Sequence, residues 1–365
     1  MQRRSVGRVR TVLNRSTVVL PPLALAVLVA VWGRHLPIPV EVVVVALLGG
    51  SVLAAVHHAE VVAHRVGEPF GALILAVAVT VIEVGLILTL MVSGGSGTAT
   101  LARDTVFAAV MITCNGIAGL SLLVTALRSH VAVFNAEGTG AALAAVITLA
   151  TLSMVLPTFT ISAPTPQFSG PQLAFAAVAS LTLYALFVIV QNIRHREYFM
   201  PVAAPPDEHP DSPSGRQALI SLVLLLVALT SVVGLAKVES GTIEAGVARL
   251  GLPHSFVGVV IAVLILLPET LAAVRNARRD QVQISLNLAF GSAIASIGLT
   301  IPAIAVASIW LKGPLHLGLG ATQIVLLALT AGVGILTVMP GRATLLQAAV
   351  HLAVCAAFLF LAASP

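Results

Sequence analysis

The sequence is poor in charge: only 9% of its 365 residues are Asp, Glu, Lys or Arg, whereas 58% are hydrophobic. Its mean hydropathy of +1.05 lies outside the range of soluble globular domains and predicts an integral membrane protein. The net charge of +5 comes from arginines scattered singly through short loops, which argues against a nucleic-acid-binding face.

The sequence also lacks the cysteine and histidine patterns of disulfide-bonded and zinc-dependent proteins. The two cysteines, Cys114 and Cys355, lie inside apolar runs and form neither a disulfide framework nor a ligand-spaced pair. A His-Glu-x-x-His pattern does not occur. An intramembrane enzyme would need such a metal motif or a nucleophile with its base, so enzymatic activity is only a remote alternative.

Apolar runs long enough to cross a bilayer, at about 20 residues each, recur along the chain. Eleven candidates lie at 17–32, 40–56, 70–92, 105–127, 140–158, 173–190, 218–236, 255–274, 284–311, 321–339 and 344–362. The arginine-rich start is read as leading into a retained helix, not as a cleavable signal peptide. An inside N-terminus puts 14 Lys and Arg residues inside and 5 outside, which predicts a cytoplasmic N-terminus and an outer C-terminus.

A proline-rich polar stretch at 194–216 divides the spans and predicts a disordered or semi-extended cytoplasmic linker. One extra helix and five spans precede it, and five spans follow. Because five is odd, the halves have opposite topology, which is the inverted repeat of many secondary transporters. The predicted fold is all-α, with a basic N-terminus and extra helix at 1–33, a first repeat at 38–193 and a second repeat at 217–363.

Two acidic residues, Glu83 and Glu269, lie inside apolar spans, each in the second span of its repeat. A charged side chain in the bilayer costs roughly 2.5–3.5 kcal/mol on insertion scales, so such a residue predicts a functional site. Burial disfavours the charged carboxylate and a bound cation favours it, so protons and a cation compete for the same oxygens. With alternating access this competition gives a cation/proton exchanger. A membrane scaffold, another remote alternative, would not need these acids.

Polar side chains near the two acids are candidate secondary ligands or site-lining residues: Thr80, Asn115, Ser292 and Ser296. Oxygen donors alone favour a hard cation such as Ca²⁺. Pro268 is expected to free a backbone carbonyl one turn earlier, just before Glu269, and Pro302 to break the next helix similarly. The spacing of four that continues from Ser296 to Thr300 is also typical of close helix packing, and that alternative stays open.

His57, Glu60 and His64 share one helical face at the inner end of the second span. Snorkelling toward the membrane interface explains them, and a pH-sensing or cation-regulatory role is the alternative. Five further acids are read as interfacial or loop charges: Glu41, Asp104 beside Arg103, Glu137, and Glu239 with Glu244 in an external segment, 238–253, expected to form a short surface helix.

Five stretches taken together are specific to one group of transporters: 58–61, 65–71, 79–83, 268–269 and 287–292. They resemble the calcium/proton exchangers of the calcium/cation antiporter superfamily, most closely the bacterial ChaA-type calcium, sodium and potassium/proton antiporters. The resemblance implies a helix before two repeats, with Glu83 and Glu269 as the glutamates that bind cation and proton. The wider family's Gly-Asn before each glutamate is replaced here by Val79-Thr80 and Ile265-Leu266, which removes one amide ligand per repeat.

We therefore expect a secondary transporter of the bacterial inner membrane that exchanges Ca²⁺ for protons, with Na⁺ or K⁺ as further substrates left open. The alternative is a monovalent cation/proton antiporter with little Ca²⁺ activity. The expected partners are inorganic cations, protons and the lipid bilayer, with no nucleic acid and no cofactor. The sequence leaves ion selectivity and oligomeric state open.

Overall fold

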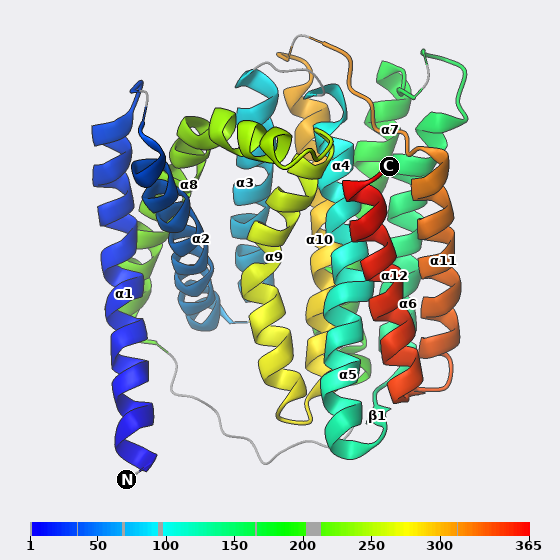
Figure 1. Cartoon of the computed structure of the whole chain (residues 1–365). Coiled ribbons are helices and arrows are strands. Elements are labelled where there is room, and N and C mark those ends of the chain that lie inside the picture. The colour runs from blue at the N-terminus through cyan, green and yellow to red at the C-terminus, as the bar shows by residue number, and fades with distance from the viewer. Residues whose placement is uncertain are drawn as a thin grey trace. The chain divides into compact units, whose positions relative to one another are not determined.

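The computed structural model is helical almost throughout (Figure 1). It describes residues 2–34, 36–67, 70–93, 98–164, 166–201, 213–311 and 313–365. Within these residues, 10 helical stretches are long and apolar enough to cross a membrane, and a shorter apolar helix, Arg15–Val31, precedes them. The predicted all-α membrane fold is confirmed, with the first of the expected spans shorter than the others.

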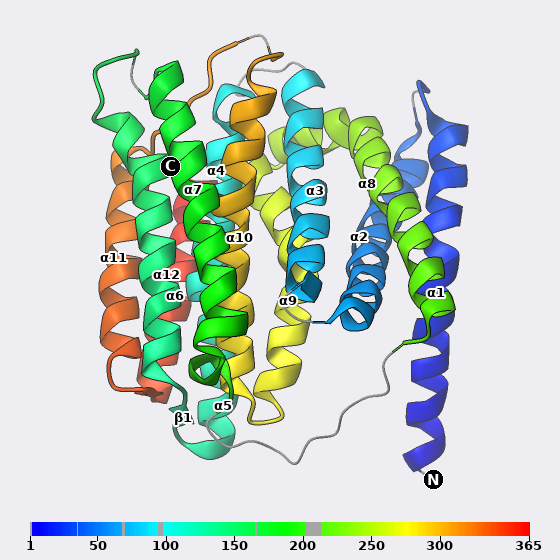
Figure 2. The same cartoon turned by 180° about the vertical axis from the view of Figure 1, so that it is seen from behind.

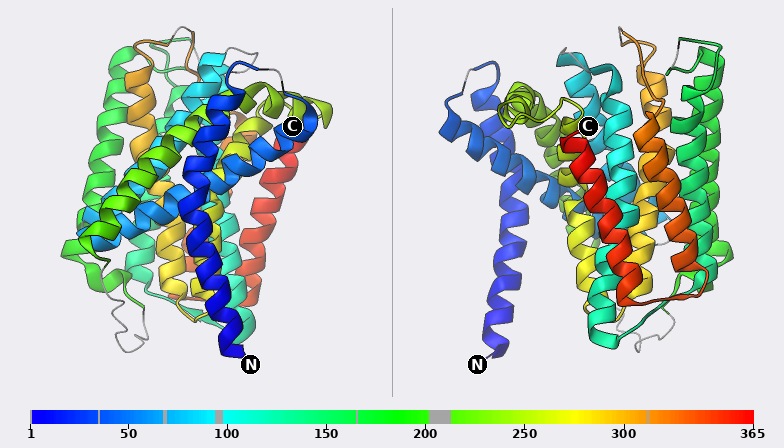
Figure 3. Two further views of the ribbon diagram at one scale, coloured as in Figure 1. Left: turned by 90° about the vertical axis from the view of Figure 1, so that its left-hand side faces the viewer. Right: turned by 45° about the vertical axis from the view of Figure 1, so that its right-hand side comes forward.

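Two compact units make up the fold, and the first contains residues 1–93 and 210–246. It holds α1 (Gln2–Val31), α2 (Ile38–Val66), α3 (Phe70–Ser93) and most of α8 (Gly215–Arg249). Within this unit α2 packs on both α1 and α3, and Figure 3 (left) shows α2 and α8 crossing beside α1. Gly85 of α3 lets α8 approach closely, because a Cβ there would lie 2.5 Å from Val233 Cγ2.

Helix α8 continues to Arg249, so the separate surface helix expected at 238–253 is wrong. The apolar run ends near residue 236, but no proline follows until Pro253, so the helical hydrogen bonding continues beyond the apolar run. Gly251, with φ of +70°, ends the helix, and its N–H donates to the Ala248 carbonyl at 3.0 Å. Hydropathy therefore located the membrane-spanning part of α8 but not the end of the helix.

The second unit contains residues 94–209 and 247–365. Its first span is continuous from α4 (Thr98–Met111) through a π-helical segment, η1 (Ile112–Ile117), into α5 (Ala118–Ser129). The other long helices are α6 (Ala136–Ala150), α7 (Gly170–Ile189), α9 (Phe256–Ala277), α10 (Val282–Ala307), α11 (Ala321–Val338) and α12 (Leu345–Ala363). Shorter helical segments are η2 (Thr151–Val155), η3 (Leu156–Thr158), η4 (Val190–Arg194) and η5 (Arg196–Phe199).

Helix α10 is the core of the second unit, where it packs against α6, α7, α9 and η1. Figure 2 shows α7 running along α10, and Gly298 makes this approach close, because a Cβ there would lie 2.7 Å from Tyr184 Cβ. Figure 3 (right) shows α12 beside α11, and α12 also packs on α5. A short antiparallel pair, β1 (Ala132–Val133) with β2 (Arg342–Ala343), joins the turn after α5 to the turn before α12.

Residues 202–212 of the predicted linker at 194–216 lie outside the described residues. Its start is ordered, because Arg196–Phe199 forms a short helical turn and Phe199 is only 6% exposed. The Phe199 ring contacts Phe187 of α7, with ring centroids 5.9 Å apart, and its carbonyl accepts a hydrogen bond from Asn287 Nδ2 at 2.6 Å. The start of the linker is thus part of the second unit.

Candidate functional site

Glu269 lies in the α9–α10 hairpin of the second unit. Near the turn of this hairpin, the Ser285 hydroxyl of α10 donates to the Ala273 carbonyl of α9 at 2.7 Å. Glu269 is one turn before Ala273 on the same face, and Ser292 and Ser296 continue the face of α10 that carries Ser285. Because the two helices are antiparallel, Glu269 lies between the level of Ser285 and the levels of Ser292 and Ser296. The hairpin therefore places Glu269, Ser292 and Ser296 along the interface between α9 and α10, which we call the α9–α10 seam.

The prolines do not interrupt the two helices. Helix α9 runs unbroken through Pro268 and α10 through Pro302, so the expected break at Pro302 is wrong. Proline within a membrane helix is tolerated when neighbouring helices hold the segment in place. Since Pro268 has no N–H, the Leu264 carbonyl lacks its helical donor, and its use as a backbone ligand stays a prediction.

The small polar residues of α10 are unequally buried. Ser296 is 5% exposed and Thr300 is fully buried, whereas Ser292 is partly exposed. The Thr300 hydroxyl has no hydrogen-bond partner, which is costly for a buried polar group. Thr300 therefore fits the packing alternative, while Ser292 and Ser296 lie closer to the level of Glu269.

Replacing Thr300 by Val is expected to leave transport intact and to raise the free energy of unfolding by about 1 kcal/mol, because it removes an unpaired buried hydroxyl while keeping the shape. Thermal unfolding in detergent and transport in liposomes measure the two quantities. The matched control is Thr330→Val, which should lower stability because the Thr330 hydroxyl accepts a hydrogen bond from Asn115. Loss of transport in Thr300→Val would show that Thr300 belongs to the cation site.

Asn115 lies in the π-helical segment η1 and is fully buried. Its Nδ2 donates to Thr330 Oγ1 at 2.9 Å, and its Oδ1 lies 3.2 Å from His351 Nδ1. An amide oxygen only accepts, so Nδ1 of His351 carries the proton and Nε2 accepts from Thr337 Oγ1, 3.1 Å away. The Asn115 amide is thus held toward α11 and α12, and its role as a cation ligand stays a prediction.

The network around Asn115 includes two features that the sequence prediction missed. π-Helical segments inside α-helices occur frequently at functional sites, but periodicity does not reveal them. His351 is 3% exposed inside the otherwise apolar α12, and a lone histidine in an apolar span was the available signal.

Glu83 and Thr80 lie in α3 of the first unit. Glu83 is only 3% exposed, which agrees with its expected burial. The Thr80 hydroxyl donates to the Ala76 carbonyl at 2.8 Å, so its proton is used within its own helix while its oxygen lone pairs stay available as ligands. Glu83 belongs to the first unit and Glu269 to the second, and their joint binding of one cation stays a prediction.

The predicted His57, Glu60 and His64 face lies within α2, which extends to Val66. His57 is partly buried, whereas Glu60 and His64 are exposed, as interfacial side chains would be. In the part of the chain that the structure describes, no group of three or more His, Cys, Asp or Glu side chains is placed to hold a metal ion. A pH-sensing role for this face stays a prediction.

His58, next to His57 in α2, hydrogen-bonds to two other helices. It is 2% exposed, and its Nε2 donates to the Thr17 carbonyl of α1 at 2.9 Å. Its Nδ1 can then only accept, and it lies 3.3 Å from the Ser221 hydroxyl of α8. His58 therefore ties α1, α2 and α8 together within the first unit.

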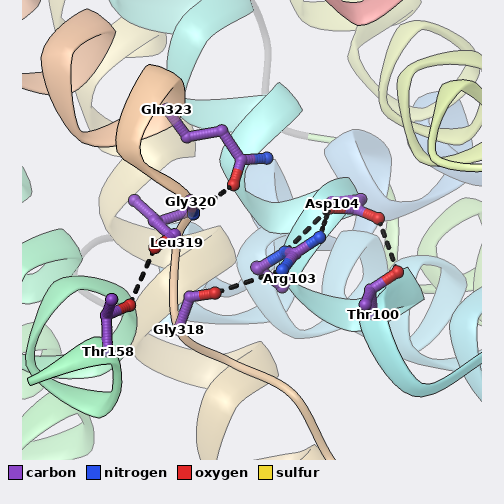
Figure 4. Close-up of polar contacts among 8 residues, drawn as sticks. All are labelled: Thr100, Arg103, Asp104, Thr158, Gly318, Leu319, Gly320 and Gln323. Carbon is purple, nitrogen blue, oxygen red and sulfur yellow. Dashed lines mark hydrogen bonds and ion pairs between the residues drawn. The ribbon is translucent and has the colours of Figure 1, made fainter. Parts of the chain in front are cut away.

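Arg103 and Asp104 form an ion pair in α4 in which Asp104 is buried and Arg103 is partly exposed, so reading them as loop charges is wrong (Figure 4). Arg103 Nη2 lies 2.8 Å from Asp104 Oδ1, and the two side chains are 16% and 4% exposed. Thr100 donates to Asp104 Oδ2 at 2.8 Å, and Arg103 Nη1 donates to the Gly318 carbonyl at 3.1 Å. The pair fastens the segment that precedes α11 to α4.

Comparison with known proteins identifies the family. The sodium/calcium exchanger protein family matches residues 38–192 and 220–363. A protein of Sinorhizobium fredii (strain NBRC 101917 / NGR234), named as ionic transporter y4hA, is 47% identical over 322 residues, with 87% of each chain covered. The sodium-potassium/proton antiporter ChaA of Escherichia coli (strain K12) is 33% identical over 359 residues, covering 96% of this chain and 97% of that protein.

Solved structures share the fold. The structure of native YfkE superposes with a TM-score of 0.70 at 16% identity, covering 95% of this chain and 99% of that chain. The H⁺/Ca²⁺ exchanger CAX gives a TM-score of 0.65 at 16% identity, covering 96% of this chain and 93% of that chain. The chain is therefore a multi-pass membrane transporter and not an enzyme, and it belongs to the sodium/calcium exchanger protein family.

Proposed function

We propose that this protein exchanges Ca²⁺ for protons across a bacterial inner membrane. Glu83 and Glu269 bind the cation and the protons alternately, and the observation that carries the proposal is the position of these acids inside apolar helices, where Glu83 is 3% exposed and Glu269 is partly exposed. Thr80, Asn115, Ser292, Ser296 and the backbone before Pro268 supply the supporting oxygen ligands. The N-terminus is cytoplasmic and the C-terminus is outside, as the arginine distribution predicts.

The two matched stretches support an inverted repeat. The first begins with α2 and the second with α8, so Glu83 in α3 and Glu269 in α9 each lie in the second helix of a stretch. Equivalent helices of opposite topology meet near the bilayer midplane in many secondary transporters, which is where a shared cation site belongs. The proposal is that the two carboxylates contribute to one such site.

The position of the two carboxyl groups inside apolar helices couples cation movement to proton movement. An empty site with two charged carboxylates in hydrocarbon is strongly disfavoured, so the site changes its exposure either with protons bound or with a cation bound. Because one set of oxygens serves both ligands, the cation can leave only as protons arrive. This pair of carboxyls supplies at most two protons for each transport cycle.

Monovalent cation/proton antiport is the second candidate function, and two observations favour it. The full-length relative from Escherichia coli is named as a sodium-potassium/proton antiporter. This chain also carries Val79-Thr80 and Ile265-Leu266 where the wider family has Gly-Asn, which leaves fewer oxygen ligands for a divalent ion. Ca²⁺ takes 6–8 oxygens, so water and backbone carbonyls would have to complete its shell here.

Purified protein in liposomes with an acidic interior separates these candidates. Internal pH is followed as Ca²⁺, Na⁺ or K⁺ is added outside. We expect Ca²⁺ at low concentration to drive proton efflux, with smaller responses to Na⁺ and K⁺. A response to Na⁺ or K⁺ alone would show that the protein is a monovalent cation/proton antiporter and not a Ca²⁺/proton exchanger. No response to any of these cations would contradict cation/proton exchange.

A further inference from the structure

A second acid of the first unit, Glu239, is buried as Glu83 is. It is 0% exposed, lies in α8 beyond the membrane-spanning run, and neither carboxylate oxygen has a hydrogen-bond partner. Glu41, in the first turn of α2, lies within electrostatic reach of it. The Thr242 hydroxyl, one turn after Glu239 on the same face of α8, donates to Glu41 Oε1 at 3.2 Å. Two carboxylates and a hydroxyl thus converge at one end of this unit.

No described basic side chain neutralises the carboxylates of Glu41 and Glu239. Among the described residues, no basic side chain forms an ion pair with Glu41 or Glu239. Lys237 is two residues before Glu239, which places it on a different side of the helix, and its Nζ lies 5.7 Å from the centroid of the Trp32 ring. The α2 N-terminus favours a negative Glu41, but only by a fraction of a charge. A buried carboxylate without a hydrogen bond, next to a second one, needs a cation or a proton.

The pair is separate from Glu83 within the first unit. Glu41 lies 25 residues before the end of α2 at Val66, whereas Glu83 lies 13 residues after the start of α3 at Phe70. The turn between these helices joins their ends, so the difference of 12 residues, at about 1.5 Å each, places Glu41 roughly 18 Å farther from that turn. One cation cannot contact both acids across such a distance.

The geometry points to a second cation site, formed by Glu41, Glu239 and Thr242, that takes a hard cation of the Ca²⁺ class. All three donors are oxygens, which suits Ca²⁺ and not a softer metal. Because fewer than three acidic or imidazole ligands converge here, water and backbone carbonyls complete the shell. The site joins α2 and α8, the first helices of the two family-matched stretches, whereas the proposed transport acids lie in the second helices.

Ca²⁺ binding to the purified full-length protein tests the site in a background without transport acids. In the double variant Glu83→Gln/Glu269→Gln, equilibrium dialysis with radioactive Ca²⁺ should still find one bound Ca²⁺ per chain. Adding Glu239→Gln or Glu41→Gln should remove it. Adding Glu137→Gln should not, because Glu137 is an exposed acid of the other unit and serves as the matched control.

Two results would overturn the site. The double variant could bind no Ca²⁺, in which case Glu41 and Glu239 share a proton instead of a cation. Alternatively, bound Ca²⁺ could survive both Glu239→Gln and Glu41→Gln, which would place it elsewhere. Size-exclusion chromatography checks folding, and Glu41→Gln, at a partly exposed position, tests the site even where Glu239→Gln unfolds. Absence of Ca²⁺-driven proton efflux in the wild type would contradict the proposed transport but not this binding site.

Discussion

Replacing Glu269 or Glu83 by Gln is expected to abolish cation-driven proton movement in liposomes while leaving protein abundance unchanged. Gln keeps the size of the side chain but cannot release a proton, so it can neither carry one nor balance the charge of a bound cation. Losing about 3 kcal/mol of cation binding alone would weaken binding more than 100-fold. Internal pH, followed after addition of Ca²⁺, Na⁺ or K⁺, measures the effect.

Aspartate variants at the same positions separate charge from geometry. Glu269→Asp keeps an ionisable carboxyl but withdraws it by one methylene, so we expect weakened exchange with a higher cation requirement. Glu137→Gln removes an exposed acid and should exchange as the wild type does. Retained exchange in Glu83→Gln or Glu269→Gln would remove that residue from the transport site. Parallel loss in Glu137→Gln would mean that the assay reports a general charge effect.

The membrane-spanning helices and the burial of Glu83 were predictable because their signals are local. A long apolar run identifies a membrane span. A single Glu inside such a run is energetically costly whichever helices the span contacts, so the sequence alone marks it as unusual. Glu83 is buried as expected, and the α9–α10 hairpin brings Glu269 to the seam that carries Ser292 and Ser296. These features depend on hydropathy and helical period, and the sequence contains both directly.

The residues that the prediction misjudged lie where helices extend beyond their apolar runs. Helix α4 begins at Thr98, seven residues before the predicted span at 105, and this extra length takes Asp104 into the helix. Gly258 of α9 then allows close packing, since a Cβ there would lie 2.8 Å from the Asp104 carbonyl carbon. Glu239 is buried for the same reason in α8. Hydropathy locates the part of a helix that lies in the bilayer but not the residues at which the helix ends. The prediction therefore placed Asp104 and Glu239 outside the membrane-spanning helices.

The Asn115 network could not be predicted for a different reason. Its partners Thr330, Thr337 and His351 come from helices more than 200 positions away in the chain, and only the packed unit brings them together. The π-helical segment also shifts the helical phase around Asn115, so a regular period assigns its side chain to the wrong face. Sequence could indicate that Asn115 is unusual in an apolar span, but not which helices it contacts.

Replacing Asp104 by Ala is expected to lower the free energy of unfolding by about 1–3 kcal/mol, because it leaves the largely buried Arg103 guanidinium without its counter-charge and the Thr100 hydroxyl without its acceptor. Asp104 is 4% exposed at the side chain, accepts from Thr100 and Arg103, and lies at the crossing of α4 and α9. Thermal unfolding of the purified protein in detergent measures the change. The Gly318 carbonyl alone would remain as a partner of Arg103.

Two comparisons show whether burial of the pair is the cause. Replacing both partners, as Arg103→Met/Asp104→Leu, should recover much of the lost stability, because a buried ion pair exchanged for apolar residues of similar size is often neutral or stabilising. Glu197→Ala breaks the exposed contact of Glu197 with His195, whose side chains are 64% and 40% exposed, and should cost less than about 1 kcal/mol. Equal losses in Asp104→Ala and the double variant would instead assign the effect to packing volume. A loss in Asp104→Ala no greater than in Glu197→Ala would mean that water reaches Arg103, and that the segment before α11 is not held by the ion pair.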